Sequence, residues 1–131
     1  MLEYLKPDKT CILINNNEII FSSKENGIIP LVKYIYYNGL PKTNTILIDK
    51  VIGMAIANVV VFSQITTVFT NIISKPALDF LIKHGVDVHY TILVENILRY
   101  DKTDICPIEK RVLTLNNPNE VVELLYQIVI K

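Results

Sequence analysis

The chain has 131 residues, with 13 basic and 13 acidic side chains, two histidines and two cysteines. We expect one domain over residues 1–131, because this length can bury a core without disulfides or a structural metal. Zero net charge argues against general nucleic-acid binding, and two cysteines exclude a disulfide framework.

No segment of the sequence predicts export or membrane insertion. Residues 1–10 contain four charged side chains, so they lack the apolar core of a signal peptide. The most apolar stretch, residues 51–62, is shorter than the ~20 residues that cross a bilayer. We therefore expect a cytoplasmic protein with no membrane contact, in which Cys11 and Cys106 are free thiols.

A β-hairpin is the first predicted element. Two apolar runs, residues 11–14 and 18–21, flank the turn-forming asparagines of residues 15–17. A helix is then expected from Pro30, whose fixed φ suits a first turn, to Gly39, which suits a helix end.

Two strand-then-helix units follow. The first is a strand over residues 45–48, with Asp49 as the helix N-cap and a helix over residues 51–63. The second is a strand over residues 66–73, with Ser74 as the N-cap and a helix that ends at His84 and Gly85. A further strand is expected over residues 86–93.

The last third is less regular. It predicts a short helix over residues 94–99, a polar connection over 100–105, a helix over 107–113 and a final helix capped by Asn117. Because strands alternate with helices after an initial hairpin, the fold class is α/β, and we expect a three-layer α/β/α sandwich around a mixed sheet.

Ligands of open α/β sheets bind beyond the carboxyl ends of the strands, where helices begin. Asp49, Lys50 and Ser74 are expected at this edge. A cation such as Lys50 in a first helical turn opposes the helix dipole, which hints at an anionic ligand. The simpler interpretation is that Asp49 and Ser74 only cap their helices and that Lys50 points into water.

Cys106 and Glu109 form a separate candidate site. A thiol at a helix start is stabilised as thiolate, and Glu109 can bind a ligand or cap the short helix. A nucleophilic cysteine normally needs a base, and only His84 and His89 are available, so a Cys–His pair has little support. A metal at Asp49, Cys106 or Glu109 would need an unusual mixture of carboxylate and thiolate ligands, and we expect neither a metal nor a cofactor.

In order along the chain, several short motifs resemble the uncharacterised prokaryotic family called domain of unknown function 1893. They are Gly27-Ile28 with Pro30-Leu31, Asp49-Lys50-Val51-Ile52-Gly53 with Ala55 and Ala57, Ser74 with Pro76-Ala77-Leu78, His84-Gly85, and Cys106-Pro107 with Glu109. The resemblance covers nearly the whole chain and implies a cytidine-deaminase-like fold.

The resemblance does not carry zinc-dependent deamination with it. Zinc deaminases need a His-x-Glu motif, or a cysteine in place of the histidine, and a later Pro-Cys-x-x-Cys. Residues 48–50 and 74–77 stand at these places and contain neither histidine nor cysteine. Met54 also stands where we would expect a basic residue after Gly53, which weakens an anion-binding role there.

Three hypotheses remain. The first is a small nucleotide- or nucleobase-like ligand bound by Asp49, Lys50, Ser74, Cys106 and Glu109. The second is an enzyme that uses Cys106 as a nucleophile or redox thiol, with Asp49 as a second catalytic residue. The third is a non-catalytic assembly domain, a homo-oligomer whose interface uses Tyr34, Tyr36 and Tyr37.

Overall fold

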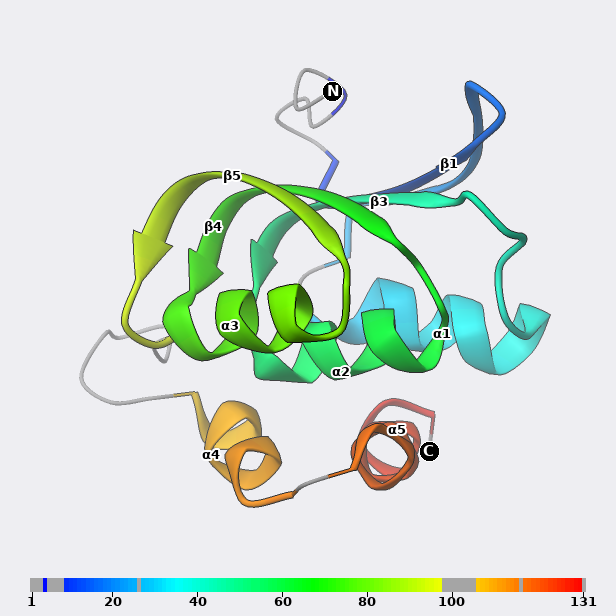
Figure 1. The fold of residues 1–131 in the computed structure, drawn as a ribbon. Helices are drawn as coiled ribbons and strands as arrows, with labels where there is room; N and C mark the ends of the chain where they lie inside the picture. Colours follow the sequence, from blue (N-terminus) through cyan, green and yellow to red (C-terminus); the bar gives the residue numbers. More distant parts are fainter. Residues whose placement is uncertain (1–3, 5–8, 26, 98–105, 116, 131) are drawn as a thin grey trace.

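The computed structural model describes the chain except for residues 1–3, 5–8, 26, 98–105, 116 and 131. In the described part, five strands form one sheet in the order β2-β1-β3-β4-β5 (Figure 1). The strands are β1 (Cys11–Asn15), β2 (Glu18–Ser23), β3 (Ile46–Ile52), β4 (Thr67–Ser74) and β5 (Asp87–Val94). The helices are α1 (Ile29–Asn38), α2 (Met54–Phe62), α3 (Lys75–Lys83), α4 (Pro107–Leu113) and α5 (Pro118–Val129).

The predicted hairpin is confirmed. β1 pairs antiparallel with β2, and the turn residues Asn16 and Asn17 have positive φ angles of 53° and 66°. Asparagine tolerates this left-handed conformation, which matches the twist of the two strands. β1 also pairs antiparallel with β3, while β3, β4 and β5 are mutually parallel. The sheet is therefore mixed, as expected for this α/β chain.

The order of the layers differs from the predicted α/β/α sandwich. α1, α2 and α3 lie against one face of the sheet, and α4 and α5 pack beneath them as a second helical layer (Figure 1). None of the five helices covers the opposite face of the sheet. The reason is topological: β3, β4 and β5 follow one another in one direction, so two right-handed crossovers place α2 and α3 on the same side.

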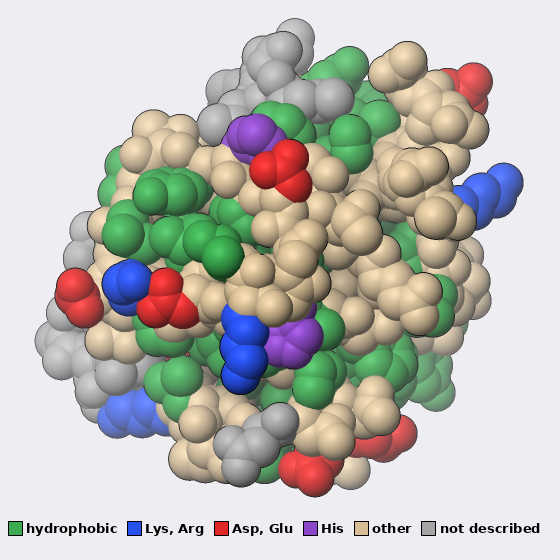
Figure 2. All heavy atoms as spheres, viewed as in Figure 1, with side chains coloured by type: hydrophobic (Ala, Val, Ile, Leu, Met, Phe, Trp, Pro, Cys, Tyr) green, Lys and Arg blue, Asp and Glu red, His purple; other side chains and the backbone are tan. Residues whose placement is uncertain are grey.

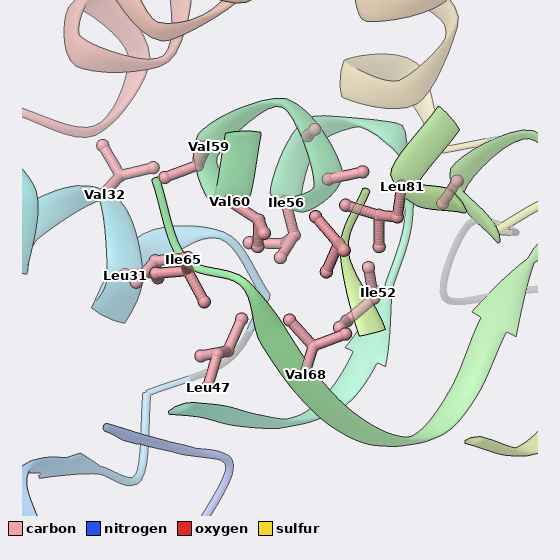
Figure 3. Packing of buried hydrophobic residues seen from close by; sticks show 14 of the residues in the cluster. Leu31, Val32, Leu47, Ile52, Ile56, Val59, Val60, Ile65, Val68 and Leu81 are labelled. Carbon is pink, nitrogen blue, oxygen red and sulfur yellow. The ribbon is translucent and has the colours of Figure 1, made fainter. Parts of the chain in front are cut away.

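The main core lies between the sheet and the helices. α2 is apolar nearly all round because it packs against the sheet on one side and against α4 and α5 on the other. Figure 3 shows aliphatic side chains from α1, α2, α3, β3 and β4 meeting in this layer. The labelled members are Leu31, Val32, Leu47, Ile52, Ile56, Val59, Val60, Ile65, Val68 and Leu81.

The other face of the sheet carries a smaller cluster. Ile12, Ile14 and Ile48 are buried there, and the half-buried Ile46 and Phe69 pack against them. The edge strand β5 also carries exposed hydrophobic side chains, Tyr90, Ile92 and Leu93, which alternate between the two faces of the sheet. Figure 2 shows hydrophobic atoms gathered over β5 on the left of the view.

Two predicted features of the last third need comment. Val94 belongs to β5 and residues 95–97 are not helical, so the start of the predicted helix over 94–99 is wrong; its last two residues and the connection over 100–105 lie outside the described residues. The helices at 107–113 and after Asn117 are confirmed. Within the described residues, no helix is long and apolar enough to cross a membrane.

Candidate functional site

Asp49 and Lys50 lie inside a strand, not at a helix start. β3 continues to Ile52, and α2 begins only after Gly53. The predicted N-cap role of Asp49 and the predicted first-turn position of Lys50 are therefore wrong. The β-branched residues Val51 and Ile52 favour the longer strand. Lys50 is exposed, and its backbone N–H donates to the carbonyl oxygen of Thr10 at 3.0 Å.

Asp49 is buried beside the core rather than displayed at the sheet edge. It is 4% exposed and stands in register with Cys11 of β1 and Thr70 of β4. One of its oxygens, Oδ2, has no hydrogen-bond partner among the described residues. Burial raises the pKa of Asp49 well above its usual value, against the opposing effect of the backbone amides of Lys50 and Val51. Burial, and then the nearby Asp49, raise the pKa of the Cys11 thiol as well.

The start of α2 is capped by a residue distant in sequence. Gly53 is the N-cap and offers no side chain, while Glu109 of α4 accepts hydrogen bonds from the backbone N–H groups of Met54 and Ala55 at 2.6 and 2.8 Å. A carboxylate at this position satisfies two unpaired donors and favours the helix dipole. Burial raises the pKa of Glu109, while these two amides act in the opposite direction.

Gly53 permits this contact. A Cβ atom at Gly53 would overlap the carboxyl group of Glu109 and the side chain of Ile97. The φ of Gly53 is −106°, which any residue adopts, so the glycine is required for close approach and not for backbone conformation. Glu109 therefore caps α2, whereas the sequence suggested a ligand contact or a cap for its own helix.

A small cavity of about 150 Å³ adjoins this cap. Cys106 lines it together with Glu109 and Gly53, and its backbone N–H donates to the carbonyl oxygen of Ile97 at 2.9 Å. The thiol is half-buried. The remaining walls are mostly aliphatic and come from Gly27, Ile28, Val51, Ile56, Ile97 and Ile108.

Ser74 lies apart from this lining. It is the N-cap of α3, as predicted: its buried hydroxyl oxygen accepts a hydrogen bond from the backbone N–H of Ala77 at 3.3 Å. Asp49 and Lys50 do not line the cavity either. The structure thus brings together two of the five predicted site residues, Cys106 and Glu109.

Neither histidine joins Cys106. The exposed His84 ends α3, with Nδ1 at 2.9 Å from the carbonyl oxygen of Phe80. The exposed His89 lies on β5, with Nε2 at 3.0 Å from Asp87 and its ring stacked on Phe69. Among the residues that the structure describes, no group of three or more His, Cys, Asp or Glu side chains is arranged to hold a metal ion.

Comparison with known proteins identifies the family. The model of the family described as "Domain of unknown function (DUF1893)" matches residues 1–129. The chain belongs to the DUF1893 family. A crystal structure of a DUF1893 family protein from Thermotoga maritima is 27% identical, with a TM-score of 0.87 over 96% of this chain and 85% of that chain. No curated protein matches this DUF1893 chain.

Sequence reasoning missed Gly53, Ile97 and the other walls of the cavity. One signal was present, since a glycine precedes the apolar helix where Ser, Thr, Asp or Asn is the usual N-cap. A glycine N-cap leaves the first N–H groups of the helix without a local side-chain partner, so water or another part of the chain must satisfy them. Which part does so depends on tertiary structure, because the partner lies 54 residues away from Ala55.

Proposed function

We propose that this DUF1893 chain binds a single-ring, nucleobase-like molecule in the cavity beside the start of α2. The observation that carries the proposal is the position of Glu109, whose buried carboxyl group caps α2 and also lines the cavity with Cys106. The site therefore has a fixed polar group in a mostly aliphatic enclosure, which is the usual composition of a small-molecule site.

The cavity volume selects the size of the ligand. Drug-sized ligands occupy roughly 300–1,000 Å³, while this cavity has about 150 Å³. An engineered apolar cavity of roughly that size in another protein holds one benzene ring. A pyrimidine-like base fits such a space, whereas the ribose and phosphate of a nucleotide would have to remain outside it.

Charge also favours a neutral base over a phosphate. The N-terminus of α2 is a natural anion site, but Glu109 already occupies it. A phosphate group would be repelled by this carboxylate, and Met54 supplies no positive charge. The Glu109 oxygens keep free lone pairs beyond the two backbone bonds, so they can accept an N–H group of a base.

The cytidine-deaminase-like frame implied by the family resemblance supports the same ligand class. Zinc-dependent deamination does not follow from it, because Ile48-Asp49-Lys50 and Ser74-Lys75-Pro76-Ala77 offer no zinc-binding histidine or cysteine. We therefore assign binding to Glu109 and Cys106, and we place Asp49, Lys50 and Ser74 outside the ligand contacts.

Titration with uracil and cytosine, followed by protein NMR and thermal unfolding, tests the proposal. Either base is expected to shift the amide signals of Gly53, Met54 and Ala55 and to raise Tm by several degrees at saturation. Uridine 5′-monophosphate should bind at least ten times more weakly. No shift with any base at millimolar concentration would contradict the proposal.

A matched pair of variants locates the binding. Glu109→Gln should weaken base binding at least tenfold, because it removes the carboxylate that faces the cavity. Glu18→Gln is the control, since Glu18 is also acidic but is exposed and lies outside the cavity. Equal binding by the two variants would show that Glu109 does not contact the ligand.

A covalent role for Cys106 is the second candidate. The observation that favours it is that Cys106 and the potential base Glu109 line the same cavity. Labelling with iodoacetamide, read by mass spectrometry, tests it, with the fully buried Cys11 as the internal control. Alkylation of Cys106 much faster than that of a free cysteine, and slower in Glu109→Gln, would support it. Labelling no faster than free cysteine would contradict it.

A further inference from the structure

The outer helical layer contains a much larger hollow than the cavity beside α2. A groove of about 730 Å³ is lined by residues of α4, of α5 and of the segment that joins them. These two helices form the layer farthest from the sheet (Figure 1). Its floor includes the half-buried Leu115 and Leu124. An open groove with leucines at its base is typical of a site where another protein docks.

The two walls of the groove carry opposite charges. Lys110 and Arg111 lie on the α4 side, and Glu120 and Glu123 lie on the α5 side. The arrangement follows from helix physics, because cations favour the last turn of α4 and an acid favours the first turn of α5. The groove therefore presents a basic wall beside an acidic wall, with no net charge.

This charge pattern selects the occupant. A strongly basic or strongly acidic partner would be repelled by one of the walls. The same surface on a second copy matches both walls. A two-fold axis that runs parallel to the groove places the basic wall of one copy opposite the acidic wall of the other. We propose that a second copy of this chain docks on the α4–α5 groove to form a two-fold symmetric dimer.

The side chains of the walls suit this packing. Arg111 has a long aliphatic stem that can cover the leucine floor of the partner copy, and its guanidinium group pairs well with carboxylates. Each Arg111 would then reach Glu120 or Glu123 of the other copy, twice per dimer. This groove is not the interface that the sequence suggested, which used Tyr34, Tyr36 and Tyr37. One link exists between the two regions, because Tyr126 of α5 contacts Tyr36.

The mass of the protein in solution is the first test. Light scattering during gel filtration at low ionic strength is expected to give twice the mass of one chain, and the dimer should weaken as salt is raised. A wild-type protein that stays monomeric at 100 µM in low salt would overturn the proposal, whatever the variants do.

Charge reversal supplies the second test. One variant reverses the basic wall (Lys110→Glu with Arg111→Glu), and another reverses the acidic wall (Glu120→Lys with Glu123→Lys). Each alone is expected to be monomeric, because like charges then face one another across the two-fold axis. An equimolar mixture should form a heterodimer, because each wall again meets its opposite.

Recovery in the mixture separates docking from misfolding, which mixing cannot repair. Circular dichroism of each variant provides the check on folding. The control reverses the exposed Lys75–Asp79 ion pair on α3 and should leave the mass unchanged. Reversed variants that dimerise like the wild type, or a folded mixture that stays monomeric, would overturn the proposal.

Discussion

The two parallel strand-to-helix junctions start their helices in different ways. At the β4–α3 junction, Ser74 caps the helix with its own hydroxyl group. At the β3–α2 junction, Gly53 has no side chain to offer, and Glu109 supplies the cap from another helix. One cap is made within three residues, and the other closes a loop of more than fifty residues.

The difference teaches how a cap can also build a site. A local cap such as Ser74 satisfies its helix and reaches nothing else. The distant cap ties α4 to α2 and places a buried carboxyl group next to a cavity. The same contact therefore holds the second helical layer in place and supplies the polar group that we assign to ligand binding.

Gly53→Ala should break the distant cap and should change the free energy of unfolding more than the other variants. The added methyl group overlaps Glu109 and Ile97, so we expect a loss of about 3 kcal/mol in the free energy of unfolding from overpacking and the displaced cap. Urea unfolding measures it. If the clash with Glu109 is responsible, Glu109→Ala in the same chain should recover part of the loss. An unchanged midpoint for Gly53→Ala would show that the contact is not tight in solution.

Glu109→Gln keeps the shape of the cap and removes its charge. We expect a loss of about 2 kcal/mol, because one of the two backbone N–H groups then faces an amide NH₂ and the favourable interaction with the helix dipole is reduced. Glu18→Gln, a change at an exposed glutamate outside both hollows, should cost only a few tenths of a kcal/mol. Similar losses for the two variants would mean that the cap of α2 is no stronger than a surface charge.

Asp49→Asn tests a buried carboxyl group that caps no helix, because Asp49 lies inside β3, before the junction with α2. Removing a buried carboxylate with an unpartnered oxygen should stabilise the fold by about 1.5 kcal/mol at pH 8. Thermal unfolding of the variant and the wild type measures the gain. A destabilised variant would show that the charged form of Asp49 has a favourable partner.

The pH dependence of that gain has a definite sign. Burial raises the pKa of Asp49 in the folded state, so the folded chain holds its proton to higher pH than the unfolded chain. The stability linked to this proton is fully present below the unfolded value of ~4 and is lost as pH rises toward the folded pKa. The free energies of unfolding of the wild type and of Asp49→Asn should therefore converge in acid and diverge toward neutral pH. Glu109 contributes with the same sign.

Ser74→Ala should have the smallest effect of the four. A lost serine N-cap costs about 1 kcal/mol, and no second element depends on this hydroxyl group. Ser74→Asp should preserve most of the stability, because aspartate also caps. Base binding should be unchanged in both variants, and a loss of binding on Ser74→Ala would return Ser74 to the ligand site.

Local signals in the sequence predicted the local structure. Asn16 and Asn17 predicted the hairpin turn, Ser74 and Asn117 predicted helix starts, and Gly39 and Gly85 predicted helix ends. Each of these depends on a residue and its near neighbours, so a pattern of a few letters is sufficient. The motifs of the chain also identified its family, which the match over residues 1–129 confirms.

The remaining features depend on residues far apart in sequence. Asp49 resembles an N-cap because an apolar strand precedes it. The β-branched Val51 and Ile52 suit a strand or a buried helix, and the sheet pairing decides that β3 extends to Ile52. The order of the layers depends on the direction in which strands are added, which the alternation of strands and helices does not specify. The pairing of Glu109 with the start of α2 has no sequence signal beyond a glycine in place of a cap.

The distant cap also has a consequence for the order of events during translation. Ribosomes add roughly 5–20 residues per second, and 55 residues separate Met54 from Glu109. The start of α2 is therefore made roughly 3–11 seconds before its cap exists. Val112, Val121 and Leu125, which complete the core beneath α2, are made later still. The sheet and its first helical layer must wait for the last third of the chain, so the nascent domain exposes an apolar helix that chaperones can bind.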